Sequence, residues 1–432
     1  MSDSLKKGAV KLLTIRLVGK ALAFFLFMLL ARQMTVSSYG ELMYLFSLIA
    51  IFTVISPLGL DVLILRRANT FIAEKQYGNA KGLYQFSSRI SLLVGSVLAV
   101  LMIVGLEVTN GIGNVSREMI IGIYAIITLT GYMAIRRNFL LSLKKSIAAE
   151  LPETVIRPIL AIIIILFVVA FNDTSLSASQ VMLIVAVSWI VVTVSGKLWF
   201  DQQVTPLFSR PAKYQTHTWI MSGMPIMVTT LGFTSMAEID IIILANMSSV
   251  EDSAVYSVAV RYMQLFSLPL GVMQSISASS LALYHQRKKA SSFSALASKL
   301  SKISFLIAIP IFITLLLFSD MFLALFGEDY KKGSVVLLIL AFMATLNAWF
   351  GSTGYSLTMT GRQMTLAKLI LLALAVNIIL DVILIPIMGI EGAAIATFIS
   401  TVGWNVVAIL YIKNKLGYLI VWLPFRKYGE VN

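Results

Sequence analysis

Seven of the charged side chains inside long apolar runs of this sequence are of types that could do chemistry there. They are four cations and three acids: Arg16, Lys20, Arg157, Arg261, Asp61, Glu238 and Asp240. A charge in hydrocarbon costs ~2.5 to 3.5 kcal/mol on insertion scales, so such a residue usually faces a hydrated cavity or an opposite charge. A cation in a low-dielectric cavity attracts phosphate or carboxylate groups. We therefore expect the four cations to line a substrate cavity that attracts anions, with Lys20 the most exposed.

The three acids are candidates for a gate or for ion coupling. At ~1.5 Å of rise per helical residue, Asp240 and Arg261 lie at similar depths below the outer surface. Asp61 and Arg16 lie at similar depths on the inner side. Each couple is expected to form either a structural ion pair or a gate, and an acid whose pair breaks during transport would be protonatable. Glu238 lies two residues from Asp240, so we expect it to point to a different face.

Two further residues have competing interpretations. Arg157, beside Pro158, either faces the cavity or reaches lipid phosphates by extending its side chain. Asp381 follows Asn377 by one helical turn, and we expect a structural role for it near the outer end of its helix.

The composition sets the elements that must position these residues. Of 432 residues, 58% are hydrophobic and 12% are charged, against ~25% charged residues in soluble domains. This excludes a water-soluble globular protein and predicts an all-α polytopic membrane protein with about twelve transmembrane helices. The expected spans are 12–33, 41–65, 89–106, 118–135, 153–171, 178–198, 219–245, 254–284, 303–319, 334–358, 365–386 and 391–412.

The basic residues predict the orientation of these spans. With twelve spans, 26 of the 34 Lys and Arg residues fall on the side of both termini, 4 on the other side and 4 inside spans. Cytoplasmic loops carry an excess of Lys and Arg, so both termini are expected in the cytoplasm. The net charge of +14 is then a topology signal, and a nucleic-acid partner is not expected. No loop has room for a soluble catalytic domain.

An internal similarity predicts two halves. The turn Thr35-Val36-Ser37-Ser38-Tyr39-Gly40-Glu41-Leu42 is loosely similar to Ser249-Val250-Glu251-Asp252-Ser253-Ala254-Val255-Tyr256, 214 residues later. Both turns lie between two expected spans. We therefore expect two pseudo-symmetric six-helix lobes, residues 1–205 and 206–432, related as parallel repeats.

Several motifs make the sequence resemble a known family. They are Ala31-Arg32-Gln33-Met34 with Gly59-Leu60-Asp61, Glu238-Ile239-Asp240 with Ala254-Val255-Tyr256-Ser257, Phe326-Gly327-Glu328-Asp329-Tyr330, Thr360-Gly361-Arg362, and Gly389-Ile390-Glu391-Gly392-Ala393. Together they resemble the polysaccharide transporter branch of the multidrug/oligosaccharidyl-lipid/polysaccharide flippase superfamily, which includes Wzx-type O-antigen flippases.

This resemblance implies two lobes around a central cavity that works by alternating access. It also implies an undecaprenyl-pyrophosphate oligosaccharide substrate in a bacterial inner membrane, for synthesis of lipopolysaccharide O-antigen, capsule or exopolysaccharide. Membrane lipids, a polymerase and a chain-length regulator of the same pathway are the implied partners. Twelve spans differ from the fourteen of lipid II flippases, which disfavours a peptidoglycan-precursor role.

The sequence lacks the residues that several other classes of function require. The sequence has no Cys and two His, neither of them with carboxylates at metal-ligand spacing, so no metal site or cofactor is expected. No phosphate-binding G-x-x-x-x-G-K-[ST] motif occurs. A transporter rather than an enzyme is predicted. The alternatives are a cation-coupled multidrug exporter of the same superfamily and a membrane glycosyltransferase or polymerase of the same pathway.

Overall fold

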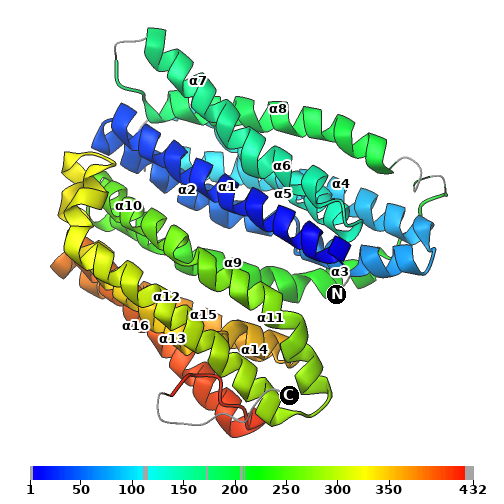
Figure 1. Cartoon of the computed structure of the whole chain (residues 1–432). Coiled ribbons are helices and arrows are strands. Elements are labelled where there is room, and N and C mark those ends of the chain that lie inside the picture. Colours follow the sequence, from blue (N-terminus) through cyan, green and yellow to red (C-terminus); the bar gives the residue numbers. More distant parts are fainter. Residues whose placement is uncertain (1–2, 110–114, 172–173, 205–207, 209, 424–432) are drawn as a thin grey trace. The chain divides into compact units, whose positions relative to one another are not determined.

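The protein is a multi-pass membrane protein built from helices. A computed structural model describes residues 3–109, 115–171, 174–204, 208 and 210–423. Within these ranges every regular element is a helix, apart from one isolated bridge between Met34 and Leu176. Eleven helices of the described residues are long and apolar enough to cross a membrane. The chain forms two compact units, Met1–Thr234 and Ser235–Asn432 (Figure 1).

The described residues of the first unit contain these nine helical elements and the start of a tenth. They are α1 (Asp3–Gln33), α2 (Val36–Ile55), α3 (Leu60–Ala73), α4 (Tyr77–Thr109), α5 (Arg117–Ser142), α6 (Ser146–Leu151), the π-helix η1 (Pro152–Ile156), α7 (Arg157–Phe171), α8 (Ala178–Val204) and the first part of α9 (Thr216–Met247).

The second unit begins within α9, at Ser235. Its further elements are α10 (Val250–Phe266), α11 (Leu268–Gln286), α12 (Ala290–Ala324), the 3-10 helix η3 (Glu328–Gly333), α13 (Ser334–Phe350), α14 (Thr353–Met359), α15 (Gln363–Met388), α16 (Ile390–Tyr411) and the π-helix η4 (Ile412–Leu416). The predicted division between residues 205 and 206 falls on residues outside the described ranges and stays a prediction.

The two similar turns both begin helices. Thr35 is the N-cap of α2 and accepts a hydrogen bond from the backbone N–H of Ser38 at 3.2 Å. Ser249 is the N-cap of α10 and accepts one from Asp252 N–H at 3.0 Å. A hydroxyl at this position satisfies one of the backbone donors that the first helical turn leaves free. The offset of 214 residues therefore matches two equivalent helix starts.

Three expected spans are interrupted in the structure. The predicted span 334–358 is divided at Gly351 and Ser352, between α13 and α14, and the spans 41–65 and 254–284 are divided as well. The predicted span 41–65 ends as α2 at Ile55 and restarts as α3 at Leu60, and the intervening Leu58 and Gly59 have φ of 51° and 72°. The predicted span 254–284 is divided into α10 and α11 at Ser267. Hydropathy averaged over a window registers none of these breaks, because the residues on both sides remain apolar.

Each unit has its own core. In the first unit Tyr84 stacks on Phe200 with ring centroids 4.7 Å apart and contacts Phe139 at 5.1 Å, which joins α4, α5 and α8. In the second unit Tyr418 stacks on Phe293 at 4.2 Å. Such ring pairs contribute ~0.5 to 1.5 kcal/mol each beyond the area they bury.

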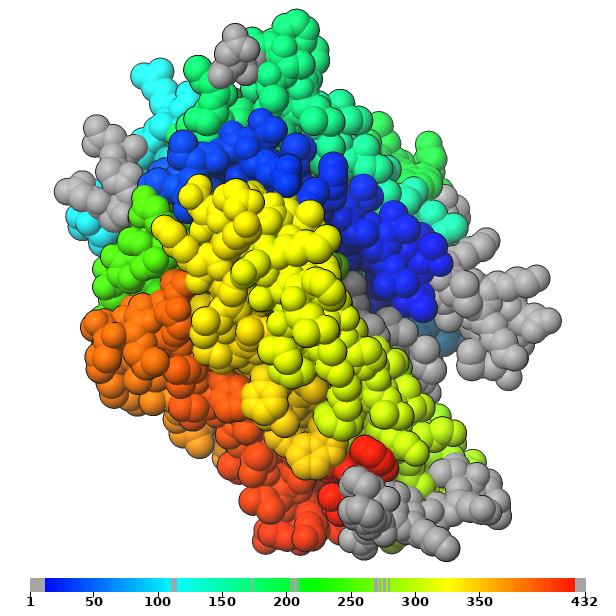
Figure 2. Space-filling view, turned by 60° about the vertical axis from the view of Figure 1, so that its left-hand side comes forward, coloured from blue at the N-terminus to red at the C-terminus, as the bar shows by residue number. Residues whose placement is uncertain are grey.

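Residues 417–423 form a non-helical strap along α12. The backbone N–H groups of Leu419 and Trp422 donate to the hydroxyls of Ser294 and Ser301, each at 3.0 Å. Figure 2 shows the red end of the described chain against the yellow-green start of α12. The hydroxyls along α12 thus satisfy backbone groups that a strap without helical hydrogen bonds would leave unpaired.

Candidate functional site

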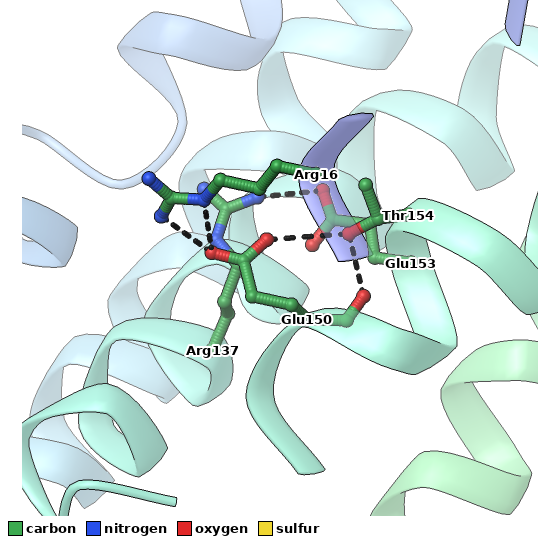
Figure 3. A network of polar contacts seen from close by, with 5 residues as sticks. All are labelled: Arg16, Arg137, Glu150, Glu153 and Thr154. Carbon is green, nitrogen blue, oxygen red and sulfur yellow. Dashed lines mark hydrogen bonds and ion pairs between the residues drawn. The ribbon is translucent and has the colours of Figure 1, made fainter. Parts of the chain in front are cut away.

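The first candidate site is a network of two arginines, two glutamates and a threonine, here called the Arg–Glu network: Arg16, Arg137, Glu150, Glu153 and Thr154. Figure 3 shows both guanidinium groups directed toward the helical run that carries the glutamates and Thr154. Arg16 comes from α1, Arg137 from α5, and the others from α6 and η1. Three segments of the first unit are therefore held together by charge.

Arg16 and Glu150 form the closest ion pair of this network. Arg16 Nη2 lies 2.6 Å and Nε 3.1 Å from Glu150 Oε1. The Arg16 side chain is 52% exposed, whereas that of Glu150 is 6% exposed. Thr154 Oγ1 donates to the backbone oxygen of Glu150 at 2.5 Å and lies 3.2 Å from its Oε2. Glu150 is thus held by both Arg16 and Thr154, whereas about half of the Arg16 side chain remains exposed.

Arg137 provides the second ion pair. Its Nη1 donates to Glu153 Oε1 at 3.0 Å, and Glu150 and Asp61 also lie within Coulombic reach of it. The neighbouring Arg136 is buried, and its Nη1 donates to the backbone oxygen of Thr193 on α8 at 3.3 Å. Both arginines therefore lie in α5, whereas the count of basic residues along the sequence had assigned them to a cytoplasmic loop.

The π-helix positions the acidic side of the network. The backbone N–H of Arg157 bonds to the oxygen of Pro152, five residues earlier, so η1 contains one wide turn. Wide turns of this kind occur often at functional sites. Gly19 allows α1 to approach this turn, because a Cβ there would lie 2.3 Å from Thr154 Cγ2 and 2.6 Å from its backbone oxygen.

The predicted pair of Arg16 with Asp61 is wrong. Arg16 binds Glu150, and Asp61 occupies the first turn of α3, where the positive helix end favours a carboxylate. The similar depths counted along the sequence thus did not identify the carboxylate that Arg16 binds. Lys20 is exposed, one turn along α1 from Arg16.

Arg157 is half-buried at the start of α7. Its guanidinium carbon lies 4.8 Å from the centre of the Trp189 ring on α8, and its Nε donates no hydrogen bond. A guanidinium over an indole face is attracted by the electron-rich ring. Arg157 thus has an aromatic partner, which the sequence interpretation did not include.

The second candidate site lies in the second unit and surrounds Asp240 on α9. Its Oδ2 accepts hydrogen bonds from the hydroxyls of Tyr256 on α10 and Thr397 on α16. Asn377 on α15 donates from Nδ2 to Thr397 Oγ1 at 3.5 Å. Asp240 is 3% exposed and Asn377 is 0% exposed. Four helices therefore converge on one buried carboxylate.

The predicted pair of Asp240 with Arg261 is also wrong. Both hydrogen bonds to Asp240 come from hydroxyls, whereas Arg261 Nη1 lies 3.5 Å from Gln264 Oε1 on its own helix. Glu238 is half-buried on α9 and Asp240 is buried, so the two acids do have different surroundings. The equal depth of Asp240 and Arg261 again did not make them neighbours.

The sequence interpretation missed the partners of the charged residues. Glu150, Arg137 and Thr397 were not singled out as site residues, although Asn377 and Asp381 were marked by their spacing of one turn. A threonine in the apolar run around Thr397 could have indicated a buried polar partner. The signal is weak, because Thr is also common at ordinary contacts between helices. For Glu150 the available signal was its position shortly before Pro152.

The chemistry open to these sites is electrostatic binding. Among the described residues no group of three or more His, Cys, Asp or Glu could hold a metal ion. The first unit instead offers exposed cations on α1 beside a fixed carboxylate, and the second a buried carboxylate held by hydroxyls.

Comparisons with solved structures show the fold. The chain is similar to an inward-facing multidrug resistance MATE family transporter of the MOP superfamily, with a TM-score of 0.76 and 15% identity over 94% of this chain and 98% of that chain. It is also similar to a MOP superfamily transporter from Pyrococcus furiosus, with a TM-score of 0.66 and 14% identity over 95% and 96% of the two chains.

Sequence comparisons show the family. A probable low-salt glycan biosynthesis flippase, Agl15 of Haloferax volcanii, is 38% identical over 98 residues, which are 22% of this chain and 21% of that protein. The alignment thus spans about a fifth of the relative's length. The family profile described as polysaccharide biosynthesis protein matches residues 5–281. The chain therefore belongs to the polysaccharide biosynthesis protein family and has the fold of these solved transporters.

Proposed function

We propose that this protein is a flippase that translocates a lipid-linked oligosaccharide by alternating access. The substrate is a repeat unit on undecaprenyl pyrophosphate, moved across a bacterial inner membrane for O-antigen, capsule or exopolysaccharide synthesis. Both termini lie in the cytoplasm, and a polymerase and a chain-length regulator act next to it. Family membership and the partial match to a probable glycan flippase support this role.

The observation that carries the proposal is the placement of Arg16 and Lys20. Both are exposed on α1, one turn apart, in a helix otherwise apolar enough to cross a membrane. A pyrophosphate is a doubly charged anion that an arginine can bind bidentately and a lysine can attract as a point charge. Glu150 already occupies one side of Arg16 and competes with the substrate, which favours release after translocation.

Lys20 provides the test because it can be altered without breaking the Arg16–Glu150 pair. The purified full chain is reconstituted into liposomes with a fluorescent undecaprenyl-pyrophosphate oligosaccharide, and the transbilayer rate is measured with and without an ion gradient. We expect Lys20→Glu to lower the rate at least about tenfold, equivalent to ~1.4 kcal/mol, Lys20→Ala to lower it less, and Lys20→Arg to preserve it. Lys332→Glu, at an exposed lysine of η3, is the charge-matched control. Wild-type rates in both Lys20→Ala and Lys20→Glu would refute the role of Lys20.

A second candidate function is cation-coupled multidrug export, which the buried Asp240 carboxylate favours. Exporters of this kind need a carboxylate in an otherwise apolar site, and Asp240 is 3% exposed. Dye efflux that is lost in Asp240→Asn, combined with normal glycan in cells lacking the gene, would select this function. Complete repeat units trapped on the inner leaflet of such cells would select the flippase.

A further inference from the structure

A hollow of about 500 Å³ lies on the surface of the first unit, between α4, α5 and α8. Its lining is aliphatic apart from one tyrosine, Tyr124. Several lining side chains are about half exposed: Val100 on α4 is 51% exposed, Ile121 on α5 49% and Ile190 on α8 44%. All three helices are long and apolar enough to cross a membrane. An apolar hollow of this kind on a multi-pass membrane protein indicates an occupant with an apolar chain.

The floor of the hollow is the first part of α5. The exposed residues of this helix are Arg117, Glu118, Ile121 and Tyr124, and the rest of α5 is buried or partly buried. The Tyr124 hydroxyl donates to Ser96 Oγ on α4 at 3.0 Å, so the two helices are joined where the exposed stripe ends. The distance from Arg117 to Tyr124 along the helix is ~10 Å. The hollow therefore runs from the Arg117 end of α5 to the Tyr124–Ser96 hydrogen bond.

The open end of the hollow carries charged side chains. On α5, Arg117 and Glu118 lie one turn before the lining residue Ile121, and on α4, Glu107 lies one turn after the lining residue Val104. Residues three or four apart share a helix face. All three charged residues are exposed, and none takes part in the ion pairs among the described residues. One positive and two negative groups therefore stand where an occupant of the hollow would emerge.

A phospholipid fits this combination of an apolar hollow and a charged end. With one acyl chain in the hollow, its head group would lie at the level of Arg117. An arginine can bind phosphate oxygens through two of its N–H groups. The carboxylates of Glu107 and Glu118 can accept hydrogen bonds from an ammonium group. A head group with one phosphate and one primary amine would thus pair with the charges of both signs.

The balance of charge at the open end selects among lipids. One arginine and two glutamates, Arg117, Glu107 and Glu118, sum to −1, and residues 178–196 of α8 contain no charged side chain. An anionic lipid such as phosphatidylglycerol therefore meets a net repulsion, and a polyprenyl pyrophosphate meets a larger one. Phosphatidylcholine matches the charges, but its quaternary ammonium has no N–H to donate. We propose that the hollow between α4, α5 and α8 binds a phospholipid with a primary amine head group.

This lipid site does not depend on what the chain transports, so it does not rest on the proposed function. All of its residues belong to the first unit, and a bound lipid would contact α4, α5 and α8 at once. A ligand that binds only the folded chain raises its stability by mass action. The protein should therefore unfold at a higher temperature with phosphatidylethanolamine than with phosphatidylglycerol of the same acyl chains.

Binding is tested by native mass spectrometry of the purified full chain in detergent, with phosphatidylethanolamine, phosphatidylglycerol and phosphatidylcholine of identical acyl chains. We expect the first bound lipid to be phosphatidylethanolamine. Arg117→Gln should lower its affinity by up to about fivefold, the loss expected for one exposed charge pair. Glu107→Lys changes the sum of the three charges from −1 to +1 and should make phosphatidylglycerol the preferred lipid.

Matched variants separate the hollow from the rest of the lipid-facing surface. Ile121→Trp fills the hollow and should weaken binding, whereas Leu101→Trp, at an exposed residue of α4 outside the lining, should not. Glu251→Lys, at an exposed acid in the first turn of α10, is the control for Glu107→Lys and should keep the wild-type preference.

Three results would overturn the proposal. They are equal binding of the three lipids to the wild type, an unchanged lipid preference in Glu107→Lys, and equal lipid binding by Ile121→Trp and Leu101→Trp. A dimer that carries no bound lipid would overturn it as well, because a second copy of the chain would then cover the hollow.

Discussion

The Arg16–Glu150 pair is asymmetric, and this asymmetry determines what its loss should do. Glu150 is 6% exposed and Arg16 is 52% exposed, so water screens the pair and limits its contribution to stability to at most about 1 kcal/mol. Glu150→Gln should therefore lower the free energy of unfolding only slightly. It should also raise the apparent affinity for a lipid-linked pyrophosphate, because Arg16 loses its competing carboxylate.

Titration of flipping rate against substrate concentration checks this prediction, with thermal unfolding of the same preparation. The control is Glu328→Gln, which removes the partner of Lys331 in an ion pair of 2.5 Å in η3. An unchanged or weaker substrate affinity in folded Glu150→Gln protein would mean that Arg16 does not meet the substrate.

At the scale of single residues, the sequence identified which side chains are costly in a membrane but not which groups compensate them. Arg16 and Asp240 were marked because they interrupt apolar runs. Their partners, Glu150 and Thr397, are 134 and 157 residues away in the chain. Depth along a helix follows from counting residues, whereas the facing surface depends on helix rotation and on local turns such as η1.

At the scale of elements, Gly19 is the point where α1 meets the π-helix. Gly19→Ala places a Cβ within 2.6 Å of the backbone oxygen of Thr154, and a backbone atom cannot rotate away. We expect α1 to shift from η1 and the free energy of unfolding to fall by about 1 to 3 kcal/mol, the usual cost of overpacking. Separation of Arg16 from Glu150 should accompany this shift.

Gly105→Ala is the matched control for that substitution. Gly105 lies in α4, and a Cβ added to it would have no atom within 4 Å, so alanine there should be neutral or should stabilise the helix by up to about 1 kcal/mol. Thermal unfolding of both variants is the measurement. Equal unfolding temperatures would show that α1 and η1 do not need their close approach.

Hydropathy predicted the elements better than it predicted their interruptions. Eleven of the twelve expected spans overlap helices of the described residues that can cross a membrane, although the helix that matches 41–65 ends at Ile55. The region 254–284 is helical but divided at Ser267, and the π turn Pro152–Ile156 was not predicted. A proline stands at the start of the following element in both places, Pro269 in α11 and Pro152 in η1, and a hydropathy window does not register the missing backbone N–H of proline.

At the scale of the whole molecule, the distribution of basic residues predicts the topology. Arg136 and Arg137 belong to α5 rather than to a loop, and without them 24 of the 26 Lys and Arg residues remain on the predicted inner side. The remaining excess still favours cytoplasmic termini, because the opposite side holds only 4 Lys and Arg residues. The orientation thus does not depend on the two residues that the sequence interpretation misplaced.

Single-cysteine labelling tests this topology directly, because the chain has no Cys of its own. Lys289 and Lys332 are both exposed, in the turn before α12 and in the turn after it. Since α12 crosses the membrane once, the two positions must lie on opposite sides. We expect a membrane-impermeant maleimide to label Lys332→Cys in intact cells and to label Lys289→Cys only after permeabilisation. The reverse pattern would mean that the protein has the opposite orientation in the membrane. Arg16 and Lys20 would then lie at the outer surface and would meet the substrate after translocation rather than before it.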